Sequence, residues 1–220
     1  MRPEEIEQES MRIIGAEMGP WDGPAENLPI VKRVVHTTAD FDFVKNLRFS
    51  DGAVERARRA LAAGCAVVTD TNMAAAGINK TSAARFGVEV VCRMAGKEVR
   101  EAALARGVTR AVVSMEIAAE KTPEAIFAIG NAPTALIRLC ELVKEGRAKP
   151  SLVIGVPVGF GNGGAVRAHG RAVHRGDGTQ GRLDGRLRDS ERSALWHTIK
   201  ISAKEYRPVR ARRLPRRRRR

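Results

Sequence analysis

The sequence predicts an α/β fold with a mostly parallel sheet flanked by helices. Over residues 1–160, short apolar runs rich in Val and Ile alternate with stretches of helical pattern. Strands that alternate with helices imply parallel neighbours joined by helical crossovers. The 220-residue chain is long enough to bury a substantial core. We therefore predict one α/β domain over residues 1–160, followed by a segment of different character over 161–220.

Four segments of this domain are predicted as strands. Each is a short apolar run that ends in polar or glycine-rich residues, as the buried strands of a parallel sheet do. They are "CAVVTD" (65–70), "GVEVVCRM" (87–94), "AIFAIGN" (125–131) and "SLVIGVPV" (151–158).

Helical patterns lie before and between these runs. Residues 51–63 combine a candidate N-cap, Asp51, with an Ala- and Arg-rich body and Gly64 as a stop signal. Residues 134–145 follow Pro133, which suits a first helical turn. Helices are also predicted over 112–119 and over the residues that follow Pro29.

Three segments at the ends of predicted strands are candidates for ligand binding, because ligands of parallel α/β sheets bind at the carboxyl ends of the strands. Their backbone N–H groups suit an anionic ligand. Asp70, in the first of them, either lines the mouth of a site or caps the following turn. The segments are "TDTNM" (69–73), "GNAPT" (130–134) and "GVPVGFGNGG" (155–164).

The formal charge of +14 is concentrated in the C-terminal segment. Residues 161–220 hold 18 of the 39 basic residues and 5 of the 25 acidic ones, so residues 1–160 hold 21 basic and 20 acidic residues. The predicted domain is therefore almost neutral, and with 4% aromatic residues in the chain it does not resemble a nucleic-acid-binding surface. The segment "RPVRARRLPRRRRR" is expected to be disordered, because like charges repel.

Cysteines, termini and apolar runs exclude several classes of protein. Three widely separated cysteines fit neither a disulfide framework nor a metal site, and their apolar neighbours predict buried side chains. No apolar run is long enough to span a membrane, and "MRPEEIEQES" lacks the apolar core of a secretory signal. We expect a soluble, cytoplasmic protein.

The residues "GFGNGG" (159–164) match the glycine pattern of a dinucleotide-binding turn. That pattern must open a helix with an apolar face, whereas "AVRAHGRAVHRGDG", which follows, has none. We interpret the match as accidental and expect no nucleotide cofactor. Titration with NAD(P) tests this, and micromolar binding would favour an oxidoreductase instead.

His36 is the only histidine in residues 1–160. Imidazole is the side chain that most readily exchanges a proton near neutral pH. Val34 and Val35 precede it, and Thr37 and Thr38 follow, so its position fits either a packed helix face or a site. From the residues alone, both interpretations stay open.

Five segments together resemble the precorrin-8X methylmutase (precorrin isomerase) family, and they occur in the family's order and spacing over nearly all of residues 5–160. Of the family's branches, the motifs look more like cobalt-precorrin-8 enzymes. The segments are "ESMRIIGAE" (9–17), "VKRVVHTTADFDF" (31–43), "TDTNMAAAGINK" (69–80), "IGNAPTAL" (129–136) and "GVPVGF" (155–160).

The resemblance implies an isomerase of cobalamin biosynthesis that moves a methyl group from C-11 to C-12 of precorrin-8X or cobalt-precorrin-8. It implies no cofactor or metal, and a homodimer with sites near the subunit interface. The family's catalytic histidine, a proton donor and acceptor, falls on His36, and two substrate-contacting positions fall on Ser10 and Arg33. From the two polar segments we add Asp70, Thr71, Met73, Asn131 and Thr134 as expected substrate-binding residues.

The chain departs from the family after about residue 160. The family continues with a helix, a strand and glycine turn of the type Pro-Tyr-Ile-Val-Val-x-Gly-Arg-Lys-Gly-Gly-Ser, and a last helix. Synonymous codons can be chosen for residues 171–186 that, read one base later, encode Gly-Pro-Tyr-Ile-Val-Val-Thr-Gly-Arg-Lys-Gly-Gly-Ser-Thr-Val. We therefore hypothesise a frameshift near residues 158–170, which DNA sequencing tests.

Residues 161–220 suggest two alternatives to an active methylmutase. One is an inactive, truncated family member that binds a corrinoid without converting it. The other is a nucleic-acid-binding protein with a basic arm. Deletion of residues 205–220 separates the second from our interpretation, which expects the loss of nonspecific, salt-sensitive DNA attraction only.

Overall fold

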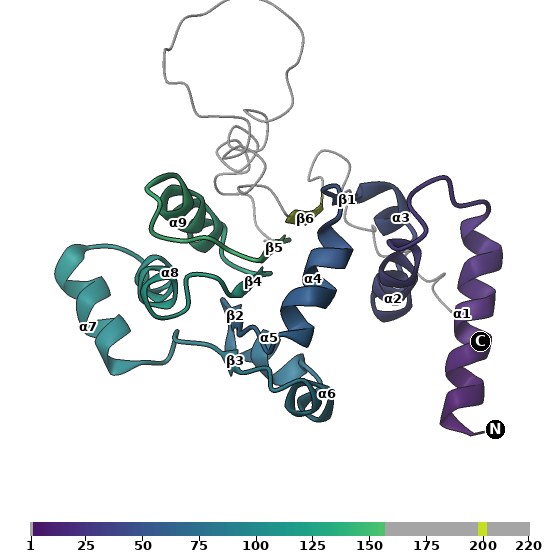
Figure 1. Ribbon diagram of the computed structural model, residues 1–220, viewed down its shortest axis with the longest axis horizontal. Coiled ribbons are helices and arrows are strands. Elements are labelled where there is room, and N and C mark those ends of the chain that lie inside the picture. The colour runs from purple at the N-terminus through teal and green to yellow at the C-terminus, as the bar shows by residue number, and fades with distance from the viewer. Residues whose placement is uncertain (1, 157–197, 202–220) are drawn as a thin grey trace, which may run out of the picture.

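The computed structural model describes residues 2–156 and 198–201, and within them it shows helices packed around one sheet (Figure 1). The helices are α1 (Pro3–Met18), α2 (Leu28–Thr38), α3 (Asp42–Asn46), α4 (Ala53–Ala62), α5 (Asn72–Gly77), α6 (Lys80–Arg85), α7 (Lys97–Arg106), α8 (Arg110–Lys121) and α9 (Pro133–Lys144). The strands are β1 (Leu47–Phe49), β2 (Val67–Thr69), β3 (Val90–Val91), β4 (Ile126–Ile129), β5 (Leu152–Gly155) and β6 (Thr198–Ile201).

The sheet has the order β1-β6-β5-β4-β2-β3 over the described residues. Every neighbouring pair from β6 to β3 is parallel, and only the edge strand β1 pairs antiparallel, with β6. This confirms the predicted mostly parallel α/β sheet. β6 comes from the C-terminal segment, for which the sequence predicted no strand, and it separates β1 from β5.

All four predicted strands are present, and each is shorter than its apolar run. β3 has only two residues, because it lies at the sheet edge and pairs with just two residues of β2, Val67 and Val68. The predicted runs are longer because each includes polar or glycine-rich residues that lie beyond the end of its strand.

The predicted helices are also present, with two differences. The N-cap of α4 is Gly52, whose φ is 66°, and not Asp51, so that assignment was wrong. The turn needs a positive φ directly before the helix, and glycine adopts it without strain. α8 is longer than predicted, because the side chain of Thr109 caps it by accepting a hydrogen bond from the N–H of Val112 at 3.3 Å.

The sheet is covered on both faces, and the alternation of side chains along each strand divides the core. Phe127 of β4 points to the cluster formed with Met115 of α8 and Leu139 of α9. Its neighbour Ile126 points to the other cluster, which contains Val31 of α2. Figure 1 shows α8 and α9 on one side of the strands and α4 on the other.

The structure also bears on the cysteines and on membrane-spanning helices. The cysteines, expected to be buried, are half-buried; Cys65 and Cys140 pack against the two core clusters, and Cys65 Sγ lies 3.2 Å from the carbonyl oxygen of Glu124. Among the described residues, no helix combines the length and apolar character needed to cross a membrane.

Candidate functional site

His36 lies in the last turn of α2 with its side chain exposed. Val31 and Val35, which are four residues apart on the opposite side of this helix, are 0% and 1% exposed and anchor it in the core. The helix ends two residues later at Thr38, and its C-cap, Ala39, adopts a φ of 53°. Of the two interpretations left open by the sequence, the packed one is therefore excluded for this chain, and the imidazole is open to solvent.

Arg33 connects His36 to α1. It lies three residues before His36, so the two side chains are neighbours on the helix surface, and its guanidinium forms an ion pair with Glu7 of α1. The hydrogen bond and the charge of Arg33 lower the pKa of Glu7 below its ordinary value, and His36 adds a smaller contribution in the same direction. Both findings place Glu7, Arg33 and His36 close together.

Ser10 lies one turn after Glu7 on α1. Its hydroxyl donates a hydrogen bond to the carbonyl oxygen of Ile6 at 2.9 Å. Ser10, Arg33 and His36, the three residues given by the family resemblance, are therefore on the adjoining helices α1 and α2. Glu7 was missed by the sequence analysis, although its spacing of three from Ser10 puts both on one helical face.

Asp70 follows β2 and is 1% exposed. Its Oδ1 accepts a hydrogen bond from the N–H of Gly130 at 3.2 Å. Its Oδ2 accepts two more, from the N–H groups of Asn131 at 2.7 Å and Ala132 at 2.8 Å. The turn that Asp70 caps is thus not the one that follows it in the chain but the one after the neighbouring strand β4.

These bonds change what the "GNAPT" segment offers a ligand. Three of its backbone N–H groups are directed at Asp70, and Pro133 has none. The segment therefore presents side chains at this edge, with Asn131 exposed and Thr134 half-buried. The hydroxyl of Thr134 lies 3.3 Å from that of Thr109, a partner that no local pattern in the sequence indicated.

The "TDTNM" segment forms the start of α5. Thr71 is the N-cap, and its hydroxyl accepts a hydrogen bond from the N–H of Ala74 at 3.1 Å. Its carbonyl oxygen accepts one from the hydroxyl of Thr69 at 3.0 Å. Met73 is 82% exposed, which is unusual for a large apolar side chain.

The structure therefore brings the expected site residues together in two groups. The first, on α1 and α2, holds Ser10, Arg33 and His36. The second, at the carboxyl ends of β2 and β4, holds Asp70, Thr71, Met73, Asn131 and Thr134. In Figure 1, α4 lies between α2 of the first group and α5 of the second.

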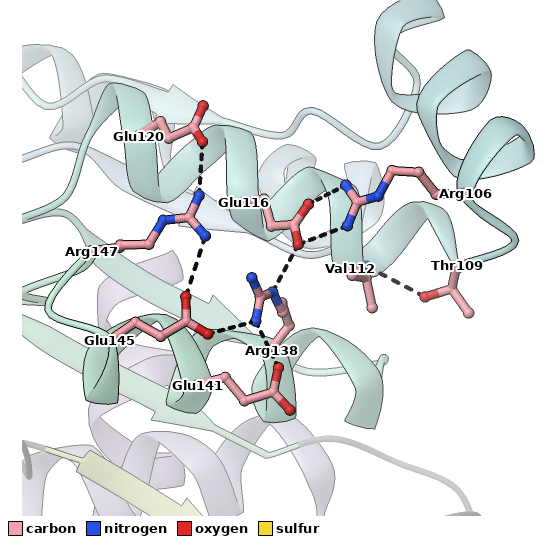
Figure 2. Close-up of polar contacts among 9 residues, drawn as sticks. All are labelled: Arg106, Thr109, Val112, Glu116, Glu120, Arg138, Glu141, Glu145 and Arg147. Atoms are coloured by element: carbon pink, nitrogen blue, oxygen red, sulfur yellow. Dashed lines mark hydrogen bonds and ion pairs between the residues drawn. The ribbon is translucent and has the colours of Figure 1, made fainter.

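A further polar cluster links α7, α8 and α9 (Figure 2). Its centre is Glu116, which binds Arg106 at 2.5 Å and Arg138 at 2.8 Å. These partners lower the pKa of Glu116 and outweigh the effect of its burial. Because every charge in this cluster has a partner, we interpret it as a link between helices.

Metal ligands are not grouped in the described ranges. Over residues 2–156, no three His, Cys, Asp or Glu side chains are arranged so that they hold an ion.

Comparison with known proteins identifies relatives along most of the chain. The family model described as "Precorrin-8X methylmutase" matches residues 5–173. The cobalt-precorrin-8 methylmutase of Priestia megaterium is 42% identical over 160 residues, which cover 73% of this chain and 71% of the relative. The precorrin-8X methylmutase of Pseudomonas aeruginosa is 37% identical over 155 residues, covering 70% of this chain and 74% of the relative.

A solved structure agrees with these sequence matches. The crystal structure of precorrin-8X methylmutase from Thermus thermophilus superposes with a TM-score of 0.70 at 40% identity. The superposition covers 77% of this chain and 82% of the Thermus chain.

Proposed function

The chain belongs to the precorrin-8X methylmutase family, the methylmutases of cobalamin biosynthesis, and from this premise we propose that it moves a methyl group from C-11 to C-12 of precorrin-8X or cobalt-precorrin-8. Its product is hydrogenobyrinate, or cobyrinate where cobalt is present. The reaction is an isomerisation, so one carbon–carbon bond breaks while another forms within the same molecule. No electrons are gained or lost, and the scheme requires no cofactor.

In this proposal His36 donates a proton to a ring nitrogen of the substrate. Protonation withdraws electron density through the conjugated system and eases migration of the methyl group, and the same proton returns to His36 afterwards. General acid catalysis of this type commonly contributes about 10²–10⁴-fold. The exposed imidazole at the end of α2 carries the proposal, because a buried one has no access to a macrocycle.

Arg33 and Ser10 hold the substrate beside His36. The substrate carries many carboxylates, and a guanidinium binds a carboxylate with two parallel hydrogen bonds. Arg33 is paired with Glu7 in an exposed ion pair. Because such a pair contributes little free energy, a substrate carboxylate can replace Glu7 as the partner of Arg33. The hydroxyl of Ser10 gives an additional hydrogen bond from α1 when it turns from the carbonyl oxygen of Ile6 to a substrate carboxylate.

The second group supplies the rest of the binding surface. Thr71, Asn131 and Thr134 offer hydroxyl and amide groups, and Met73 offers an exposed apolar side chain that suits the flat face of a tetrapyrrole. The macrocycle is thereby held in one orientation, which lowers the entropic part of the barrier.

We further propose that the protein acts as a homodimer with each site near the subunit interface. Within one chain α4 lies between α2, which carries Arg33 and His36, and α5 (Figure 1), so a second copy is a means of completing each site. Exposed Ile6 and Ile13 on α1 favour such an association, since they leave apolar surface in water beside the first group.

The test is conversion of precorrin-8X by His36→Ala and His36→Gln, followed by the visible spectrum of the corrinoid. We expect both variants to fold and to bind the corrinoid, with turnover reduced at least 100-fold. Arg59→Ala, a change at an exposed residue of α4, is the matched control and should retain full activity. Full turnover by folded His36→Ala would refute the proposed role. Corrinoid binding without turnover by the unaltered chain would instead indicate an inactive relative.

A further inference from the structure

Asp70 is a buried carboxylate whose hydrogen-bond partners, within the described residues 2–156, are backbone N–H groups and not cations. It is 1% exposed, and its oxygens accept three backbone N–H groups from the turn after β4. A buried carboxylate is expensive unless hydrogen bonds satisfy it. Three such bonds from one short turn indicate that the carboxylate and the turn are fitted to each other.

The turn in question is also the N-terminus of α9. Ala132 is the N-cap of this 12-residue helix, and an alanine side chain caps nothing. The carboxylate of Asp70 supplies the missing acceptor from a different strand, and its charge is favourable beside the positive end of the helix dipole.

Asp70 is itself held firmly in the chain. Its own N–H donates to the carbonyl oxygen of Ala128 at 3.3 Å, which extends the pairing of β2 with β4. On either side of it, the hydroxyl of Thr69 donates to the carbonyl oxygen of Thr71 at 3.0 Å. The backbone of Asp70 is therefore held in place, so its carboxylate can orient the turn.

We propose that Asp70 is a positioning residue, whose carboxylate fixes the 130–132 turn so that Asn131 and Thr134 face the substrate. This rests on the proposed function, in which those two side chains contact the macrocycle. Asp70 thus acts through the turn and does not touch the substrate. Because it occupies the three N–H groups, it also prevents a substrate carboxylate from binding there in a wrong orientation.

Two substitutions separate this role from a general loss of stability. Asp70→Ala removes the carboxylate and leaves three N–H groups directed at empty space. Asp70→Asn keeps the shape, but its NH₂ group must face at least one N–H donor whichever way the amide is turned. Glu116→Gln is the control, since it removes another buried carboxylate, whose partners Arg106 and Arg138 are not proposed site residues.

We expect kcat to fall about 10–100-fold in both Asp70 variants, with KM changed less than threefold, because a small misplacement of contacting groups costs rate more than binding. Glu116→Gln should lower the melting temperature and leave kcat unchanged. Formate supplies the atoms that Asp70→Ala lacks, so millimolar formate should restore part of kcat in that variant, and chloride at the same ionic strength should not.

Amide hydrogen exchange without substrate provides a second readout. Gly130, Asn131 and Ala132 should exchange faster in both Asp70 variants than in the unaltered protein, and formate should slow them again in Asp70→Ala. Unaltered exchange at these amides, or wild-type kcat in both variants, would overturn the proposal. A failure of the proposed function is distinct from either result, because it would appear as absent turnover in the unaltered protein.

Discussion

The Glu116 carboxylate of α8 accepts a hydrogen bond from the Nε of Arg138 in α9 at 2.8 Å, while it also binds the guanidinium of Arg106 in α7. Figure 2 shows that Arg138 in turn binds Glu141 and Glu145. One buried acid therefore ties three helices together on the face of the sheet opposite α4.

Glu116→Gln should lower the free energy of unfolding by about 2 kcal/mol, because both arginines lose a charged acceptor and the amide NH₂ faces a donor of at least one of them. Urea unfolding measures the change. The matched control is Glu120→Gln on the same helix, where the exposed carboxylate binds Arg147 at 2.9 Å. That change should cost less than about 1 kcal/mol. Equal losses in the two variants would contradict a central role for Glu116.

Stability should depend on pH through the same residue. The pKa of Glu116 is lowered in the folded protein from its ordinary value of 4.5. Its stabilisation is therefore complete above that pH and is lost as the pH falls through the folded pKa. We expect the difference in urea midpoint between the unaltered protein and Glu116→Gln to shrink between pH 6 and pH 3. A difference that stays constant over this range would exclude the ionised carboxylate as its cause.

Arg33→Lys should raise KM for the tetrapyrrole about tenfold with a smaller change in kcat. Lysine keeps the charge but loses the paired hydrogen bonds that a guanidinium makes with a carboxylate. Arg12→Lys provides the control, because Arg12 is an exposed arginine of α1 that binds Glu9 at 2.6 Å. Steady-state kinetics on both variants test this. An unchanged KM in Arg33→Lys would remove Arg33 from the proposed binding surface.

Ile13→Glu should weaken the proposed dimer. Ile6 and Ile13 are 53% and 43% exposed, and a spacing of seven residues puts them on one face of α1. A charge on that face would be buried in the interface without a partner. Analytical ultracentrifugation should show a shift from dimer to monomer. Leu104→Glu, at an exposed leucine of α7, should leave the sedimentation unchanged.

Much of the fold was predictable because the relevant signals are local. Apolar runs predicted β2, β3, β4 and β5, and the proline at the start of α9 marked where that helix begins. Boundaries were less accurate. The Asp51 assignment failed because the backbone conformation of Gly52, and not side-chain capping, decides where α4 starts.

The relationships among the candidate residues were easier to predict in the first group than in the second. The family motifs pointed to Ser10, Arg33 and His36, and helical spacing is enough to relate Arg33 to His36. The partner of Asp70 was not predictable, since Asp70 is bonded to Asn131, 61 residues later in the chain. Nothing in either segment by itself indicates that the two strands before them are neighbours.

What the sequence by itself determined is therefore four of the strands (β2 to β5), four of the helices (α2, α4, α8 and α9), the family and the chemical character of the candidate residues, because each depends on near neighbours or on motifs. The tertiary structure alone decided that His36 is exposed, that Asp70 binds the turn before α9, and that Glu116 joins three helices. These relationships depend on strand order and helix packing, which bring together groups that are far apart in the chain.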